Sequence, residues 1–315
     1  MYEVRIISIE ERDELLERYG ERALFQRKAD INGVCIKLLT DNKAFKEMWE
    51  DNFRFMSEDV RPHGRVFALE REGEFEVLYE PLSKTAILFN CDYYGWVKSV
   101  ALAVAGDFFE DCHSAKRRFS VHGAALDFGG VGVTIIGPPG TGKTTLSMGL
   151  LLSERRARLV SDDWYFVFPV GEFFEASASE KECYIRGDVG EIWPEFRSLI
   201  RGIPLDRRGR AVADISKLIG GRVIRQTTIR GAVLLARDPS LPPGLRDLSL
   251  SEAMEYLTAH DFCNPHQLVR DARKRKLREE FFRKFLSKLE IKLLNTTSSP
   301  SESLESAREF IRKLA

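Results

Sequence analysis

The most chemically informative stretch of the chain is Gly137–Thr145, which reads GPPGTGKTT. It fits the pattern G-x-x-x-x-G-K-[ST] of a phosphate-binding loop, in which glycines let backbone N–H groups point at phosphate oxygens. Lys143 is expected to reach the β- and γ-phosphates, and the Thr144 hydroxyl to coordinate Mg²⁺. The loop therefore predicts binding of ATP and Mg²⁺ through Gly137, Pro138, Pro139, Gly140, Thr141, Gly142, Lys143, Thr144 and Thr145.

The sequence on either side supplies the context that this motif requires. Val131–Ile136 is apolar and β-branched and is expected to form a buried strand, and Leu146–Leu152 is expected to form a helix. The helix would add the positive end of its dipole at the phosphates. An ordinary glycine-rich turn is the alternative, but the order strand, loop, helix favours an α/β nucleotide-binding domain.

Two adjacent carboxylates, Asp162 and Asp163, follow the short apolar run Leu159–Ser161. Ligands of open α/β sheets lie at the carboxyl ends of the strands, so a return strand here would bring the pair beside the phosphates. One carboxylate can hold Mg²⁺ while the other accepts a proton from an attacking hydroxyl. We expect Asp162 to bind the metal and Asp163 to be the catalytic base, although the roles could be exchanged. A solvated turn or a helix cap is the alternative.

A histidine is predicted to lie close to the phosphate-binding loop. The strand-like run Phe119–Phe128 leads into Gly129-Gly130, and two such glycines between strands predict a tight hairpin. Counting outward from this turn places His122 opposite Gly137, at the mouth of the loop. His122 is therefore a catalytic candidate, and a histidine paired inside the sheet is the alternative.

Three further charged residues are weaker candidates. Glu182 and Arg186 would share one face of a predicted strand, where they could bind metal and phosphate or pair with each other. Arg208 belongs to the basic loop Leu205–Arg210, which could contact phosphate or substrate or remain solvated.

The composition limits the classes of protein that are possible. The 315 residues are 43% apolar, enough for two domains with hydrophobic cores. The formal net charge is zero, from 48 basic and 48 acidic residues, which argues against a nucleic-acid or membrane-surface protein. Five widely spaced cysteines form no C-x-x-C pair and suggest neither a zinc site nor a disulfide framework. The N-terminus lacks a signal-peptide pattern and no apolar run is long enough to span a bilayer, so we expect a cytoplasmic protein.

The chain divides into two predicted domains. Residues 1–118 are expected to form an α+β domain of unknown role, with a hairpin at Arg71–Glu74, and residues 119–315 the α/β nucleotide-binding domain. The strands and helices expected in the first domain are strands at 4–9, 34–39, 65–71 and 76–90 and helices at 43–53 and 93–112.

Several short motifs together resemble the catalytic domain of HPr kinase/phosphorylase, which is itself similar to the nucleotide-binding part of phosphoenolpyruvate carboxykinase. They are Ser120–Gly123, Gly130–Val133, the phosphate-binding loop, Arg158–Asp163 and Ile185–Gly187. The resemblance extends over residues 119–190. It implies the P-loop nucleotide-binding fold of these two kinds of protein, ATP and Mg²⁺ as cofactors, and a homo-oligomer.

The resemblance also implies roles for individual residues. It places His122 and the pair Asp162 and Asp163 in the active site, with one aspartate acting on the proton of a seryl hydroxyl. Tyr184 stands where the family usually has Glu, so Glu182 on the same strand face is the expected substitute as a metal ligand. Two prolines also replace the small polar residues that are more usual in the loop.

The expected function is an ATP-dependent kinase acting on a seryl-type hydroxyl. Because the first 118 residues do not resemble the family's regulatory domain, we expect a free small molecule such as L-serine as acceptor, with a serine on a carrier protein as the alternative. The string GPPGTGKT is also typical of AAA+ ATPase motors, but these need an apolar strand ending in Asp-Glu, which Gly190–Glu195 does not provide. A nucleotide-binding protein without catalysis is a third reading.

Overall fold

The computed structural model describes residues 2–112, 117–181, 183–186, 189–199, 201–203, 210–213 and 219–314. The chain separates into two compact units. The first unit contains residues 1–118 and also takes in the later segments 179–181 and 265–274, while the second contains residues 119–178, 182–264 and 275–315. The two units are therefore not simple consecutive halves of the chain. None of the helices in the described ranges is long and apolar enough to cross a membrane.

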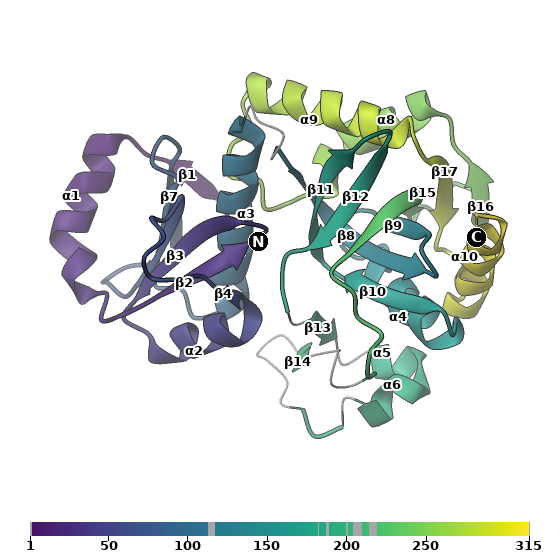
Figure 1. Ribbon diagram of the computed structural model, residues 1–315, viewed down its shortest axis with the longest axis horizontal. Coiled ribbons are helices and arrows are strands. Elements are labelled where there is room, and N and C mark those ends of the chain that lie inside the picture. The colour runs from purple at the N-terminus through teal and green to yellow at the C-terminus, as the bar shows by residue number, and fades with distance from the viewer. Residues whose placement is uncertain are drawn as a thin grey trace. The chain divides into compact units, whose positions relative to one another are not determined.

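The first unit is a mixed sheet with helices (Figure 1), and its described strands follow the order β1-β6-β7-β5-β3-β2-β4. The strands are β1 (Val4–Ile6), β2 (Phe25–Ile31), β3 (Val34–Thr40), β4 (Arg54–Phe55), β5 (Gly64–Leu69), β6 (Glu76–Glu80) and β7 (Thr85–Phe89). The helices are α1 (Ile9–Tyr19), the 3-10 turn η1 (Gly20–Arg22), α2 (Lys43–Asn52) and α3 (Tyr94–Asp111).

The hairpin predicted at Arg71–Glu74 is wrong. Strand β5 does not pair with β6 but runs parallel to β7, and the antiparallel partner of β6 is β7. The tight turn therefore lies after Glu80, where Lys84 adopts a φ of 54°. Apolar residues occupy the middle of β6 and most of β7, so the local sequence could not show which neighbour each strand would pair with.

Buried charges tie the segment 265–274 to helix α3. The Lys274 ammonium lies 2.7 Å from an Asp107 carboxylate oxygen and 3.0 Å from one of Asp111. Burial alone would raise the pKa of Asp107, but the adjacent Lys274 and Lys84 cations overcome this and lower it. Buried charges are tolerated when they are paired in this way, so these contacts explain why a late segment of the chain belongs to the first unit.

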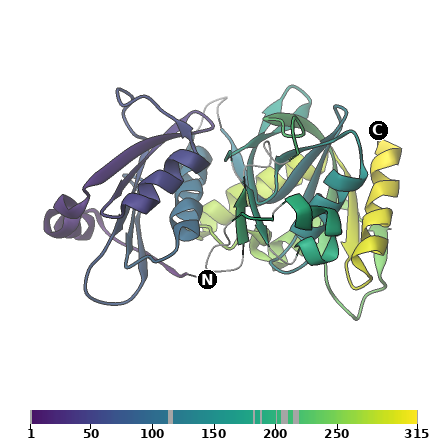
Figure 2. The same cartoon turned by 90° about the horizontal axis from the view of Figure 1, so that it is seen from below.

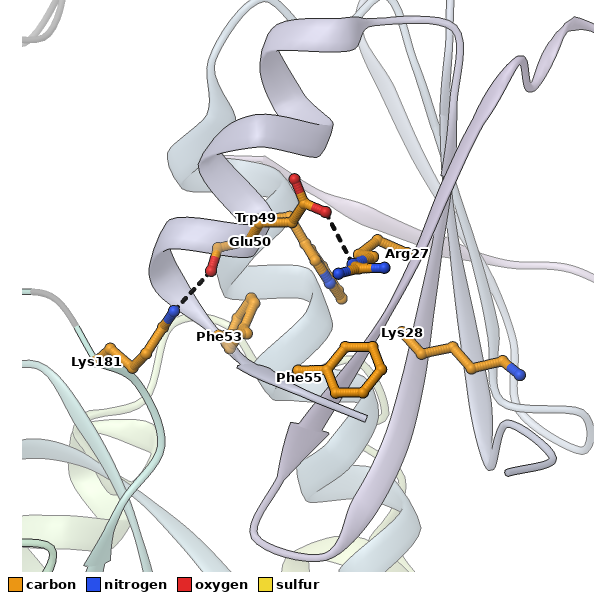
Figure 3. Close-up of a pocket in the computed structure, with 7 residues that line it drawn as sticks. All are labelled: Arg27, Lys28, Trp49, Glu50, Phe53, Phe55 and Lys181. Carbon is orange, nitrogen blue, oxygen red and sulfur yellow. Dashed lines mark hydrogen bonds and ion pairs between the residues drawn. The ribbon is translucent and has the colours of Figure 1, made fainter. Parts of the chain in front are cut away.

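A small pocket of about 90 Å³ opens beside α2 in the first unit (Figure 3) and is lined by Arg27, Lys28, Trp49, Glu50, Phe53, Phe55 and Lys181. The Arg27 Nε lies 2.8 Å from the Glu50 carboxylate, and the Lys181 ammonium donates to the Glu50 carbonyl at 2.6 Å. Lys28 pairs with Glu58. Contacts within the unit thus account for the cations of this pocket.

The second unit is built on a larger mixed sheet. Its described strands follow the order β10-β8-β11-β12-β15-β17-β16, with β9 pairing to both β8 and β15. The strands are β8 (Phe119–Phe128), β9 (Gly132–Ile136), β10 (Ala157–Ser161), β11 (Trp164–Val170), β12 (Phe173–Ala178), β15 (Gln226–Ala236), β16 (Gly244–Asp247) and β17 (Glu290–Asn295), and a separate pair is formed by β13 (Cys183–Arg186) and β14 (Arg210–Ala213).

Helices pack on both faces of this sheet, in layers that Figure 2 shows from a second direction. The described helices are α4 (Lys143–Ser153), α5 (Val189–Ile192), α6 (Pro194–Leu199), α8 (Leu250–Ala259), the 3-10 turn η2 (Asp261–Cys263), α9 (Ala272–Leu286) and α10 (Pro300–Leu314). One hydrophobic core joins α8 and α9 to the sheet and contains Ala125, whereas the other joins α4 and α10 and contains Ala124 and Leu126. Alternate residues of β8 thus face opposite cores, as the strand period of two requires.

Candidate functional site

The hairpin of β8 and β9 has the register that the sequence predicts. Gly123 pairs with Ile136, and continuing this register one step places His122 opposite Gly137. Gly129 and Gly130 have φ values of 74° and 102°, and a two-residue turn of type I′ needs positive φ at both positions. The turn glycines therefore determine which residue of β8 meets the start of the phosphate-binding loop.

The two aspartates lie beside the same strand. Strands β10 and β11 follow one another along β8, antiparallel to it, with Asp162 and Asp163 at the junction. Trp164 pairs with His122, and the Gly123 N–H donates to the Asp163 carbonyl at 2.9 Å. The histidine, the aspartate pair and the start of the loop therefore lie at one level of three neighbouring strands, as expected, although β8 intervenes between β9 and β10.

Close backbone packing at this level requires glycine at position 123. A Cβ atom on Gly123 would lie 2.4 Å from the Ile135 carbonyl oxygen. We expect Gly123→Ala to lower the free energy of unfolding by about 1–3 kcal/mol through overpacking, as measured by urea denaturation. Gly20→Ala is the control, because its Cβ would meet only Leu16 at 3.9 Å. Equal stability of the two variants would contradict the close packing.

The phosphate-binding loop has the backbone expected of an anion cradle. Gly140 and Gly142 adopt left-handed φ values of 84° and 95°, and α4 begins at Lys143. Gly142 is the N-cap of α4, and no described side chain accepts a hydrogen bond from the N-terminal N–H groups of this helix. The first-turn N–H groups of a helix lack intrahelical acceptors and form an anion site together with the helix dipole. Thr296, at the end of β17, donates its hydroxyl to the Thr141 carbonyl at 2.9 Å and so supports the loop.

The Lys143 side chain lies over the loop itself. Its ammonium donates to the carbonyl oxygens of Gly137 at 2.7 Å and Pro138 at 3.2 Å. Burial lowers the pKa of this ammonium, and the nearby Asp163 carboxylate opposes the shift. Lys143 and Asp163 are therefore close enough to interact electrostatically.

His122 is held at both ring nitrogens and is only 7% exposed. Its Nδ1 lies 2.9 Å from the Cys263 carbonyl oxygen, and because a carbonyl can only accept, Nδ1 carries a proton. Its Nε2 lies 3.3 Å from an Asp163 carboxylate oxygen. A proton carried by Nε2 would donate to that oxygen and so orient the Asp163 carboxylate, which stays unprotonated and able to accept a proton.

The two aspartates differ in exposure. Asp163 is half-buried, with 38% of its side chain exposed, whereas Asp162 is buried. A base that accepts a proton from an incoming hydroxyl must be accessible to it, so this difference favours Asp163 for that role. A cluster of three or more His, Cys, Asp or Glu side chains able to hold a metal does not occur among the described residues.

The remaining candidates are located only in part. Glu182 and Arg208 lie outside the described residues. The backbone of Arg186 lies in β13 and pairs with Arg210 of β14, but its side chain is also outside the described part. The expected ligand and phosphate-binding roles of these three residues stay predictions.

Sequence reasoning missed the contribution of Cys263. Its carbonyl contacts His122 from the turn η2, where Asp261, Phe262 and Cys263 have φ values of 49°, 55° and 56°. Residues other than glycine rarely adopt this conformation. Asp adopts it more readily than most residues, but Phe and Cys do not signal it. A main-chain acceptor contributed by a distant turn leaves no pattern in the sequence.

These observations define the second unit as a mixed α/β domain with a glycine-rich loop between a strand and a helix. No family model matches the chain. It is 32% identical over 132 residues to the HPr kinase/phosphorylase of Streptococcus equi subsp. zooepidemicus, covering 42% of this chain and 36% of the relative. The corresponding protein of Streptococcus pyogenes serotype M1 is 31% identical over the same shares, and that of Streptococcus equinus is 32% identical over 111 residues.

The predicted resemblance to HPr kinase/phosphorylase is therefore confirmed as a sequence relationship. The matching segment spans about a third of the length of these curated relatives.

Proposed function

We propose that this protein is an ATP-dependent phosphotransferase that transfers the γ-phosphoryl group to a seryl hydroxyl. The observation that carries the proposal is the position of Asp163, an accessible carboxylate that contacts His122 Nε2 at 3.3 Å and interacts with Lys143 of the loop. A phosphate cradle and an oriented base are the two parts that phosphoryl transfer to an alcohol needs.

The chain's own groups divide the reaction between them. The loop N–H groups and Lys143 hold the phosphates and stabilise charge that develops on the transferred group. The seryl oxygen attacks the γ-phosphorus, the bond from that phosphorus to the bridging oxygen breaks, and ADP leaves with the bonding electrons. Asp163 accepts the seryl proton, held in place by His122.

A divalent cation fits the residues present. Thr144 supplies a hydroxyl in the first turn of α4 and Asp162 a carboxylate at the end of β10. Mg²⁺ is commonly held by one or two protein oxygens together with substrate phosphates, so a small donor set is sufficient. When bound, Mg²⁺ would neutralise charge on the phosphates.

The acceptor that we favour is a serine of a protein. The relatives are named for HPr as their substrate, and this supports the protein acceptor, which the sequence alone placed second, over free L-serine. The motor reading loses support, because the region around Gly190–Glu195 contains the short helices α5 and α6 instead of an apolar strand.

ADP release from Mg-ATP tests this function. We expect ADP to form in proportion to a phosphoseryl protein when a seryl carrier protein such as HPr is supplied, and not with free serine, threonine or other small alcohols. Coupled ADP detection and intact mass spectrometry of the acceptor would measure this. Phosphorylation of free serine would instead establish a metabolite kinase, and acceptor-independent ADP formation would overturn the kinase assignment.

A further inference from the structure

We propose that the left-handed turn Asp261–Cys263 is a positioning element that fixes the His122 imidazole through the main-chain carbonyl of Cys263. In this role the Cys263 side chain is dispensable and its backbone conformation is not. The inference deepens the proposed function and rests on it for its catalytic consequence, although the position of the imidazole can be measured separately.

The turn is an unusual backbone structure. Three successive residues that are not glycine have φ values between 49° and 56°. The Cys263 N–H donates to the His260 carbonyl at 2.8 Å, and the Asn264 N–H donates to the Asp261 carbonyl at 3.2 Å. Left-handed conformations of L-residues cost energy and persist where the surrounding structure imposes them.

Packing holds the turn in this conformation. Phe262 is 3% exposed, and its ring stacks on Phe282 of α9 with centroids 5.4 Å apart and planes 9° apart. Phe262, Cys263 and Phe282 all belong to the core that joins α8 and α9 to the sheet. The direction of the Cys263 carbonyl is therefore set by the core of the domain.

The carbonyl determines which nitrogen of His122 faces the reaction. It accepts from Nδ1 at 2.9 Å, so Nε2 is left to contact Asp163 at 3.3 Å. The hydrogen bond made by one ring nitrogen sets the state and direction of the other. Turning this carbonyl away would release the ring and, through it, the Asp163 carboxylate.

The Cys263 thiol interacts electrostatically with Lys143, so its role must be separated from that of the carbonyl. Cys263 is 2% exposed, and burial raises the pKa of its thiol to about 12, although the nearby Lys143 cation opposes the shift. A buried thiol that stays protonated is a poor nucleophile. The atom of Cys263 that contacts His122 is the carbonyl oxygen, which every amino acid carries, so the requirement is for a backbone shape.

Matched substitutions of Cys263 separate backbone from side chain. Cys263→Gly suits the left-handed conformation and Cys263→Ser keeps the size of the side chain, so both should lower kcat far less than Cys263→Val does. Cys263→Val disfavours that conformation through its branched Cβ and should lower kcat by about 10²-fold with little change in the KM for ATP. Circular dichroism would check that each variant folds.

An NMR measurement tests the position of the imidazole without using activity. In protein labelled with ¹⁵N-histidine, the His122 signal, assigned with a His122→Asn variant, should show a protonated Nδ1 in the native, glycine and serine proteins. In the valine protein the Nδ1 protonation of His122 should differ from that in the native protein. A loss of activity in the glycine and serine variants as large as that in the valine variant would assign the role to the thiol and overturn the proposal. A native His122 without the Nδ1 proton would overturn it as well. If the native protein shows the Nδ1 proton but transfers no phosphate, the proposed function fails and the positioning of His122 stands.

Discussion

Replacing Asp163 by asparagine is expected to lower phosphoryl transfer by about 10²–10⁴-fold while ATP binding is retained. The amide keeps the size of the side chain but cannot accept the seryl proton. The loop N–H groups and Lys143, which hold the phosphates, are unchanged by the substitution. Coupled ADP release and a fluorescent-nucleotide titration would measure transfer and binding separately.

The control for this variant is Asp247→Asn, which makes the same charge change at an exposed position on β16. It should leave both transfer and binding near native values. An Asp163→Asn protein that still releases ADP at the native rate would exclude a base at this position. It would return a motor or a nucleotide sensor to consideration, because neither needs a proton acceptor there.

Replacing Lys143 by methionine is expected to lower kcat by about 10²–10³-fold and to weaken ATP binding. The ammonium lies 2.7 Å from the Gly137 carbonyl oxygen and therefore over the loop that is proposed to hold the phosphates. Methionine keeps much of the apolar stem but removes the positive charge. Lys143→Arg should also be impaired, since a planar guanidinium does not fit the place of a compact ammonium.

Lys288→Met is the matched control for the lysine substitution. Lys288 belongs to the same unit, is 43% exposed and pairs with Glu172 at 3.2 Å. The Lys288→Met variant should retain native turnover and nucleotide affinity. Native turnover in Lys143→Met would show that the loop has no part in transfer, whatever its sequence suggests.

Strand β8 links the expected effects of the Asp163 and Lys143 substitutions, because it positions both parts of the site. It pairs with β9, which leads into the loop, and with β10 and β11, which flank the aspartates. It also carries His122, which contacts Asp163. A single strand therefore determines the positions of the phosphate cradle, the base and the histidine, and a shift in its register would separate them.

Local patterns in the sequence were sufficient to predict several parts of this protein. The β-branched run before the loop became strand β9, the run after it became helix α4, and the turn glycines placed His122 opposite Gly137. In the first unit, the helices expected at 43–53 and 93–112 are α2 and α3. Each of these features depends on residues that are close together in the chain.

Tertiary structure alone decided the features that depend on distant partners. It brought the Cys263 carbonyl to His122 across 141 residues, placed β8 between β9 and β10, and joined the segment 265–274 to the first unit. It also paired β5 with β7 and so removed the hairpin expected at Arg71–Glu74. The physical reason is the same in each case. Packing of the whole core selects which distant segments pair, and neither a backbone carbonyl nor a buried ion partner contributed by a distant segment leaves a local pattern in the sequence.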